Sequence, residues 1–451
     1  MRPDSDISFL LAAAHATGAT GAERARHPGL DRRAAGTRRT DDDLDARVRF
    51  LTELARRLHL AGVSSQRLEG AVRATAGALH VSAEVWSTPT GLLLSLSDAD
   101  VLHGTQQTRV LRLEPGSVDL SALVELDRIA EAVIGGRLHV ESAWDAMRAI
   151  DRPVTIGQKV QVVGAFGLAS AAVAGLLGTG WLDIAVSLVL GLIIGWIVLM
   201  SAARPHLAAA SEAIAALVAT TLATAFANFV APLSLQTVIV SALIVLMPGL
   251  TLTTAVTELA TQQLVTGTTR FAGALTVLLK LTFGSVAATQ VLTAIGWTAP
   301  PAVPVSLPQW VEIVAAVAAA GSFAILFQAA RRDVPLVMAS AILGYVLTRA
   351  AGNWLGFTSG TFAGGVFFAS LVIAALSNLY GRFAGRPGAL VRLPGIMLLV
   401  PGSVGFRAMG FVMERDYAVG FDTLVAVLSA LLALTAGLLF GALLVPPRRY
   451  L

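Results

Sequence analysis

The sequence predicts a polytopic α-helical membrane protein with about ten transmembrane helices, arranged as two inverted five-helix repeats, and an N-terminal cytoplasmic α+β domain. Three observations support this fold class. First, 55% of the 451 residues are hydrophobic and only 14% are charged, whereas a soluble domain carries about 25% charged residues. Second, charges are ordinary up to residue 154 and scarce from Thr155 onward. Third, two Pro-Gly pairs interrupt apolar segments at matching places, Pro248-Gly249 and Pro401-Gly402.

The change in composition near Asp151-Arg152-Pro153 sets the expected domain boundaries. Residues 1–43 are predicted to be a disordered tail, because arginines and aspartates crowd into a stretch with few apolar residues. The cytoplasmic domain is expected over residues 44–152. The first membrane repeat is expected over residues 153–297 and the second over residues 298–451.

The expected domain, residues 44–152, alternates between two periodicities. Apolar residues at helical spacing predict helices over 44–60 and onward from Ser64 and Ser65. Short β-rich runs predict strands over 85–87, 91–96 and 108–113, and two more helices follow, one capped by Asp119 and one over 140–150. The domain contains no metal-ligand spacing, nucleophile elbow or Gly-rich phosphate loop. The sequence therefore predicts a regulatory or assembly role for this domain, with no catalytic residue, metal or cofactor.

Ten apolar segments are candidate spans, and a span needs roughly 20 mainly apolar residues to cross a bilayer. They cover residues 157–177, 184–200, 207–229, 235–247, 271–295, 311–330, 334–351, 361–379, 393–412 and 419–445. The fourth is too short alone and is expected to continue past Pro248-Gly249 as a broken helix. Basic residues lie in alternate loops, which predicts that both termini are cytoplasmic. These residues are Arg204, Arg270, Arg331, Arg332, Arg382, Arg386, Arg392, Arg448 and Arg449, against Arg349 and Arg415 on the other side.

The heavy use of Ala, Arg and Gly suggests a bacterial source, and so a bacterial plasma membrane. The basic residues form no stripe with interleaved aromatics, which argues against a nucleic-acid partner. The absence of cysteine excludes thiolate metal sites and a Cys nucleophile. The sequence leaves open whether the chain forms a homo-oligomer.

Each half of the membrane part contains five spans, and the fourth of each contains Pro-Gly. Because five is odd, the second copy would insert in the opposite orientation. Inverted repeats with interrupted helices at matching positions are typical of secondary transporters, whose binding site lies near the breaks. Proline removes a backbone donor and glycine loosens the helix, so backbone groups become free to contact a ligand.

Several motifs are spread across the chain: residues 61–69 (AGVSSQRLE), 87–91 (STPTG), 247–255 (MPGLTLTTA) with Glu258-Leu259 and Thr266-Gly267, and 399–403 (LVPGS). In these motifs the sequence resembles the threonine/serine exporter (ThrE) family in its fused single-chain form. The resemblance extends from about Leu44 to Ile150 and over essentially all of the membrane part. The resemblance implies efflux of threonine and serine, coupled to protons. Split relatives are linked to dicarboxylate export, so an exporter of small dicarboxylates such as succinate is the alternative.

The candidate transport residues follow the two breaks. Thr251, Thr254, Glu258 and Gln262 form one polar stripe on a helix, suited to the hydroxyl and ammonium groups of threonine or serine. Arg407 could bind a carboxylate in a forked geometry, or pair with Glu414. Pro248, Gly249, Pro401, Gly402 and Ser403 complete the predicted substrate site, an alternating-access site near the bilayer midplane.

Candidates for coupling to the proton gradient are Glu258, Lys280, Asp183 and Glu212. Two alternatives stay open for Glu258, which lies either at membrane depth or in water at the cytoplasmic surface. Lys280 could pair with Glu258 or with Asp183, and Asp183 and Glu212 could instead anchor span ends. An enzyme is not expected, since the spans contain neither His-Glu-x-x-His nor paired aspartates. A channel, or a sensor anchored by its spans, remains an alternative to a carrier.

Overall fold

In the computed structural model the chain is described over residues 28–99, 106–151, 154–202, 204–297, 300, 307–354 and 363–447. It forms two compact units, Met1–Ala46 and Arg47–Leu451. The helix α1 (Pro28–Leu60) begins inside the segment that the sequence analysis assigned to a disordered tail. Residues 28–43 are therefore helical here, and the rest of that expected tail lies outside the described residues.

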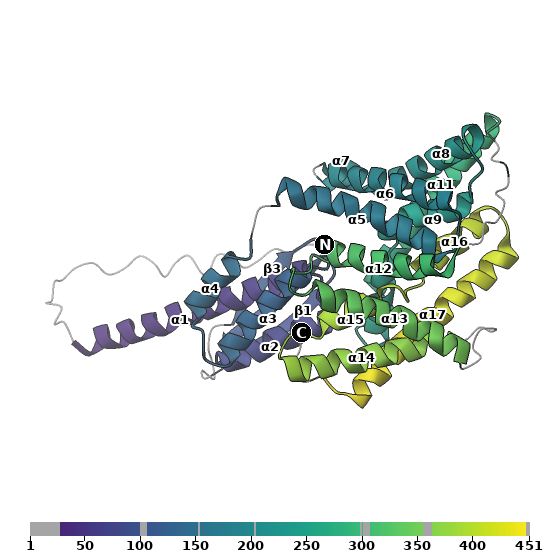
Figure 1. The fold of residues 1–451 in the computed structure, drawn as a ribbon. Helices are drawn as coiled ribbons and strands as arrows, with labels where there is room; N and C mark the ends of the chain where they lie inside the picture. Colours follow the sequence, from purple (N-terminus) through teal and green to yellow (C-terminus); the bar gives the residue numbers. More distant parts are fainter. Residues whose placement is uncertain are drawn as a thin grey trace, which may run out of the picture. The chain divides into compact units, whose positions relative to one another are not determined.

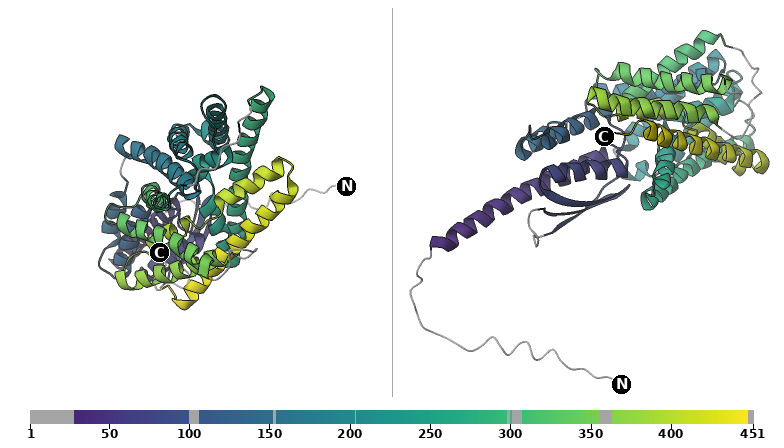
Figure 2. Two further views of the ribbon diagram at one scale, coloured as in Figure 1. Left: turned by 45° about the vertical axis from the view of Figure 1, so that its right-hand side comes forward. Right: turned by 90° about the horizontal axis from the view of Figure 1, so that it is seen from below.

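The N-terminal part of the larger unit, residues 47–151, is called the head. It contains the end of α1, α2 (Ser65–Ala78), β1 (Val81–Thr88), β2 (Gly91–Asp98), β3 (Gln107–Arg112), α3 (Leu120–Ile134) and α4 (Val140–Arg148). The strands form an antiparallel sheet in the order β1-β2-β3, with α2 against β1 (Figures 1 and 2). Successive side chains of β2 point to opposite faces of the sheet: Leu92, Leu94 and Leu96 are buried, whereas Leu93 is exposed.

Local chemistry sets the ends of these helices. Gly62 follows α1 with φ +74°, a conformation that a residue with a side chain rarely adopts. The carboxylate of Asp119 caps α3 by accepting a hydrogen bond from the amide of Ala122 at 2.8 Å. The predicted cap at Asp119 is thus present. Thr155 begins the first membrane helix with a reciprocal capping box to Gln158.

All regular secondary structure described in the membrane part is helical (Figure 1). Its helices are α5 (Ile156–Leu176), α6 (Trp181–Ala202), α7 (Pro205–Ala208), α8 (Ser211–Phe229), α9 (Leu235–Leu243), α10 (Gly249–Ala260), α11 (Leu264–Ala294), α12 (Gln309–Leu326), α13 (Val334–Trp354), α14 (Gly364–Ala384), α15 (Ala389–Met397), α16 (Gly402–Met413) and α17 (Tyr417–Leu444), with a 3₁₀ turn η1 (Ile244–Leu246) after α9.

Among the described residues, nine helical segments are long and apolar enough to cross a bilayer. A tenth arises if Leu235–Leu246 and Gly249–Ala260, which meet at a 60° bend, form one span. The ten predicted spans overlap these segments one by one, including the broken fourth. The polytopic helical membrane fold with a mixed N-terminal domain is therefore confirmed.

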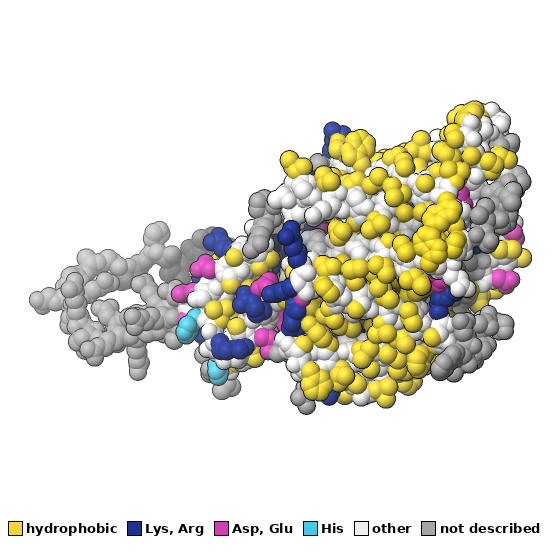
Figure 3. Space-filling view, in the orientation of Figure 1, with side chains coloured by type: hydrophobic (Ala, Val, Ile, Leu, Met, Phe, Trp, Pro, Cys, Tyr) yellow, Lys and Arg dark blue, Asp and Glu magenta, His cyan; other side chains and the backbone are white. Residues whose placement is uncertain are grey.

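Large apolar side chains cover the outside of the membrane helices (Figure 3). Trp196, Phe283 and Leu432 are each more than half exposed. A soluble protein rarely exposes so much contiguous apolar surface, but lipid tails solvate it without cost. Inside, small residues bring helices close together. A Cβ on Gly344 of α13 would collide with the carbonyl oxygen of Gly395 in α15, as is typical of membrane helix contacts.

The two Pro-Gly breaks match in the torsion angles of their prolines and in the lengths of the flanking helices, although only the first is bent by more than 40°. A nine-residue helix precedes each break and a twelve-residue helix follows it: α9 and α10 in the first half, α15 and α16 in the second. Pro248 has φ −80° and ψ 44°, and Pro401 has φ −82° and ψ 37°. The breaks lie against each other, because a Cβ on Gly402 would lie 3.2 Å from Cα of Gly249.

The turns that leave α10 and α16 also match. Gln262 and Arg415 have φ +65° and +66°. In each turn the next amide closes onto the helix: Gln263 donates to the carbonyl of Glu258 at 2.8 Å, and Asp416 donates to that of Phe411 at 2.9 Å. The helix that follows each break therefore ends in the same kind of turn.

Candidate functional site: a polar cavity between the head and α10

A cavity of about 440 Å³ lies between the head and the membrane helices. Ligand pockets usually measure about 300–1,000 Å³, so its size suits a small solute. The head contributes the α1–α2 loop, the first turn of α2 and Leu123 of α3, and the other walls come from α10, α14, α15 and α17 with the residues that follow α10 and α17. The lining residues are Ala61, Gly62, Val63, Ser64, Gln66, Arg67, Leu123, Thr253, Thr254, Thr257, Glu258, Thr261, Ala374, Asn378, Ala389, Arg392, Leu393, Ile396, Leu438, Leu439, Ala442 and Pro447.

Glu258 is the acidic residue of this lining. Its side chain is only 3% exposed, and its Oε2 lies 3.0 Å from Nε of Arg270, in the second turn of α11. The two charges form an ion pair, but the N–H direction does not meet hydrogen-bond geometry, so Nε and Oε2 both lack a hydrogen bond among the described residues. Glu258 therefore lies neither in water nor deep between the breaks. It lies at the junction of the head and the membrane part.

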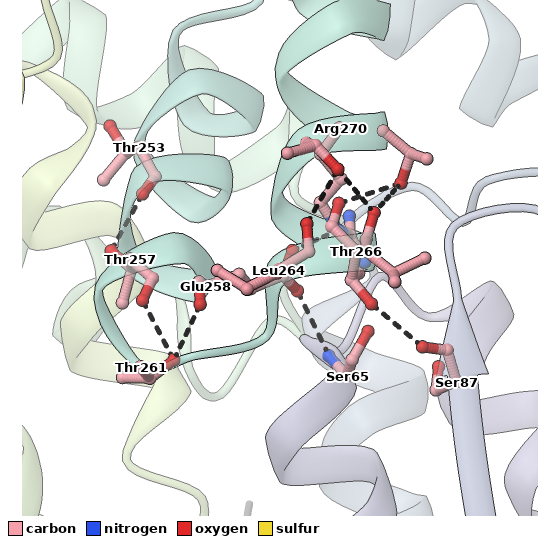
Figure 4. A network of polar contacts seen from close by, with 12 residues as sticks. Ser65, Ser87, Thr253, Thr257, Glu258, Thr261, Leu264, Thr266 and Arg270 are labelled. Atoms are coloured by element: carbon pink, nitrogen blue, oxygen red, sulfur yellow. Dashed lines mark hydrogen bonds and ion pairs between the residues drawn. The ribbon is translucent and has the colours of Figure 1, made fainter.

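Backbone and side-chain contacts join the head to this junction (Figure 4). The amide of Ser65, at the start of α2, is 3.4 Å from Oε1 of Glu258. The hydroxyl of Thr266 donates to the carbonyl of Ser87 at 3.1 Å. Farther away, the amide of Leu120 donates to the carbonyl of Phe327 at 2.9 Å. The head is thus bonded to α10, α11 and the end of α12.

Four threonines of α10 and its C-terminal cap line the cavity beside Glu258. The hydroxyls of Thr253, Thr257 and Thr261 each donate to the carbonyl four residues earlier, at 3.2, 2.8 and 3.0 Å (Figure 4). Thr254 makes no hydrogen bond through its hydroxyl within the described part of the chain. Its hydroxyl is available as donor and acceptor, and the other three oxygens retain lone pairs.

The opposite wall carries a cation. Arg392 of α15 lines the cavity and is partly buried, and none of the described residues forms a hydrogen bond or ion pair with its guanidinium. Asn378 of α14 donates to the carbonyl of Val445 at 2.8 Å, which fixes its amide at the cavity edge. The cavity therefore combines a carboxylate, hydroxyls and a guanidinium.

The structure brings only part of the predicted site to this cavity. Thr254 and Glu258 line it. Pro248, Gly249, Pro401, Gly402 and Ser403 lie instead where the two breaks pack together, and none of them is in the cavity lining. Thr251, Gln262 and Arg407 are exposed and lie outside the lining, so their predicted roles rest on the sequence alone.

Among the candidates for proton coupling, Lys280 has a different partner from those that the sequence suggested. Lys280 lies 3.5 Å from Glu212, and its ammonium donates to the carbonyl of Ala209 at 2.8 Å. Its suggested pairing with Glu258 or Asp183 is therefore wrong, since Glu212 lies nearer along the neighbouring helix. Asp183 is buried and accepts a hydrogen bond from the amide of Ser234 at 3.1 Å. Asp183 and Glu212 each lie in the first turn of a helix, α6 and α8, and bind a group of a neighbouring segment.

Sequence reasoning missed several lining residues. Thr253, Thr257 and Thr261 recur every four residues, a spacing that identifies one helix face and could have been found. Arg392 was counted as a loop residue, but α15 begins at Ala389, before it. The contribution of the head loop has no local sequence signal, because it depends on how α2 packs against α10.

The fold and the cavity define the class of this protein: a multi-pass membrane protein with a small-molecule-sized cavity whose lining mixes apolar and polar side chains. Two family models match the chain, "Putative threonine/serine exporter" over residues 49–292 and "Threonine/Serine exporter, ThrE" over residues 312–444. The chain belongs to the ThrE threonine/serine exporter family, as the resemblance in the sequence implied.

Curated relatives include fungal proteins named "Pheromone-regulated membrane protein 10". The protein of Debaryomyces hansenii is 24% identical over 81% of this chain and 37% of its own length. That of Eremothecium gossypii is 24% identical over 81% of this chain and 49% of its own length. This chain thus spans less than half the length of these two relatives. No solved structure matches it.

Proposed function

We propose that this protein is a secondary transporter that exports threonine and serine by alternating access, coupled to proton movement. Membership of the exporter family supports the direction and the substrate class. The observation that carries the proposal is the cavity wall on α10, where the buried carboxylate of Glu258 lies beside the unpartnered hydroxyl of Thr254. A carboxylate attracts the substrate ammonium, and a hydroxyl can bond the substrate hydroxyl.

The alternative of dicarboxylate export is less compatible with this wall. A dianion entering the cavity would meet Glu258, a like charge in a partly dehydrated space. Arg270 could not neutralise the dianion without releasing Glu258. A zwitterionic amino acid instead presents one charge of each sign, and the cavity offers the complement of both.

Alternating access follows from the relation between the cavity and the breaks. The breaks pack so closely that a Cβ on Gly249 would collide with the side chain of Val400. The cavity lies toward the head from this contact, between arms of the two broken helices. We infer two inverted five-helix repeats, with the close contact of the breaks separating the cavity from the opposite side of the membrane.

Glu258 is also the proposed carrier of the coupled proton. Its partners are Arg270 and the amide of Ser65, and a substrate ammonium or a proton could each replace part of the Arg270 interaction. Competition of a proton and an ammonium for one carboxylate is a simple basis for exchange. A passive channel would need no group that binds both the proton and the substrate. An exporter moves its substrate without changing it, so the proposed function includes no enzymatic reaction.

The proposed location is a plasma membrane, bacterial by composition, with the head and both termini in the cytoplasm. The absence of cysteine makes this directly measurable, because one introduced cysteine is the only thiol in the chain. Glu84→Cys in the head should be labelled by a membrane-impermeant maleimide only after the cells are permeabilised. A cysteine in the predicted outer loop over residues 297–308 should be labelled in intact cells. The reverse pattern would contradict the orientation.

Efflux from proteoliposomes tests the transport proposal. Vesicles loaded with labelled threonine should release it faster when an imposed pH gradient drives exchange. Glu258→Gln should reduce this release at least about tenfold, the effect expected for a lost charged interaction. Glu84→Gln makes the same chemical change on an exposed strand position and should leave release unchanged. Unaltered release by Glu258→Gln would contradict the role of this carboxylate, and no threonine or serine release by the wild type would contradict the function.

A further inference from the structure

The unpartnered guanidinium of Arg392 carries a further inference. Burying a cation without a partner is costly, and arginine in a protein interior normally has carboxylate or carbonyl acceptors. Arg392 lines the cavity and is only partly exposed, yet no described residue accepts a hydrogen bond from it. The other arginine of the lining, Arg67, has a polar partner of its own. Arg392 is thus the basic residue of the lining with its charge still uncompensated.

Arg392 and Glu258 line the same cavity from the two broken helices. Glu258 lies ten residues after Pro248, and Arg392 lies nine residues before Pro401. The breaks touch each other, and both arms line the same cavity. The carboxylate and the guanidinium therefore come from different halves of the chain and reach one cavity.

We propose that Arg392 binds the α-carboxylate of the exported amino acid. The inference rests on the proposed function and adds the group that recognises the other end of the substrate. A guanidinium offers two parallel N–H donors to one carboxylate, a geometry that lysine cannot match. With the substrate ammonium at Glu258 and its hydroxyl at Thr254, the three polar groups of threonine each have a partner in the lining.

The role differs from that of Arg407, the carboxylate-binding candidate from the sequence. Arg407 is exposed on α16 and is absent from the cavity lining. It also differs from the ordinary role of a basic residue near a cytoplasmic span end, which sets orientation through its charge alone. A lysine would satisfy that role equally well, but it would not reproduce a forked contact to a carboxylate.

Ligand pairs separate these roles. The full-length protein in detergent is titrated with threonine and with threoninol, which replaces the carboxylate by a hydroxymethyl group. The wild type should bind threonine at least about tenfold tighter than threoninol, as expected for a charged hydrogen-bonded pair. Arg392→Gln should bind both with similar affinity, near that of the wild type for threoninol. Arg392→Lys should keep only part of the preference.

Arg112→Gln, at an exposed position of β3 outside the cavity lining, is the matched control and should retain the wild-type preference. Retained threoninol binding by Arg392→Gln shows that its cavity is folded, so loss of the preference is then specific. An unchanged preference in Arg392→Gln, or a preference lost equally in Arg112→Gln, would overturn the assignment. If Arg392→Gln does not fold, Arg392→Lys decides, and a full wild-type preference in it would overturn the forked contact. Wild-type protein that binds neither threonine nor serine would instead overturn the proposed function.

Discussion

The two broken helices share a backbone but differ in chemistry. Both have a nine-residue helix, a Pro-Gly break, a twelve-residue helix and a left-handed exit residue. Yet Glu258, whose carbonyl accepts the exit-turn hydrogen bond in the first half, has Phe411 as its counterpart in the second. The first break bends its helices by 60°, whereas Ala389–Met413 qualifies as one continuous span. The two breaks thus share local backbone features, whereas the bend of their helices and the side chains around them differ.

The largest effect is expected where the breaks touch. Gly249→Val should reduce threonine efflux to background, because its side chain collides with Val400 and overpacking costs about 1–3 kcal/mol. Gly402→Ala should be milder, since its nearest neighbours would lie at 3.2 to 3.4 Å. Efflux and the thermal midpoint in detergent measure both. If the collision is the cause, Val400→Ala should restore part of the activity that Gly249→Val loses, and no rescue would contradict it.

The ion pair of the first half provides the second test. Arg270→Gln leaves Glu258 buried without a counter-charge, which should destabilise the protein by about 2–4 kcal/mol, because breaking a buried pair typically costs about 3–5 and Arg270 is partly exposed. The double variant Glu258→Gln with Arg270→Gln removes both charges. It should recover most of the thermal midpoint but no efflux. Recovery of efflux in the double variant would show that the pair is structural only.

Two buried aspartates, one in each half of the membrane part, can be compared in the same way. Asp333, just before α13, accepts hydrogen bonds from Arg386 at 2.7 and 2.8 Å, while Asp183 of α6 accepts from the amide of Ser234. Asp333→Asn should cost about 1–2 kcal/mol, since it removes a charged pair with a partly exposed arginine. Asp183→Asn keeps an oxygen for the amide and should cost under about 0.5 kcal/mol. Equal shifts in thermal midpoint would show that the two sites are not distinguished by charge.

The smallest expected effect concerns the head. Burial raises the pKa of the Glu69 carboxyl, although its Oε1 accepts a hydrogen bond from the amide of Ser87 at 3.0 Å. A raised pKa means that the folded state holds its proton more tightly than the unfolded state. This contribution is present below about pH 4, near the unfolded pKa, and is lost as the pH rises through the folded value.

Glu69→Gln should therefore gain thermal stability relative to the wild type as the pH increases from about 4 to about 7. Glu84→Gln, at an exposed strand position, provides the baseline. A difference between Glu69→Gln and the wild type that stays constant across this range would show that the carboxyl does not titrate on unfolding.

The sequence predicted the elements that depend on local or repeated patterns. Apolar length gave the spans, Pro248-Gly249 gave the bent helix, and Asp119 gave a cap. The sequence did not predict the cavity, because the cavity depends on contacts between distant segments. Glu258 meets Ser65 across 193 residues, and no local pattern records that contact. Arg392 illustrates the same limit of sequence analysis. From the sequence it looks like an ordinary basic residue of a loop, and only the structure shows that it belongs to α15, which begins at Ala389.

The contribution of the head to the cavity wall has a thermodynamic consequence. A solute that fills the cavity touches the loop at Gly62–Ser64 as well as α10, so part of its binding free energy comes from head atoms. By linkage, whatever factor the docked head adds to solute affinity, the solute must add to the affinity of the head for the membrane helices. A ligand or protein that loosens the head would therefore weaken solute binding in the same ratio. The binding of the solute and the docking of the head on the membrane helices are thus thermodynamically coupled.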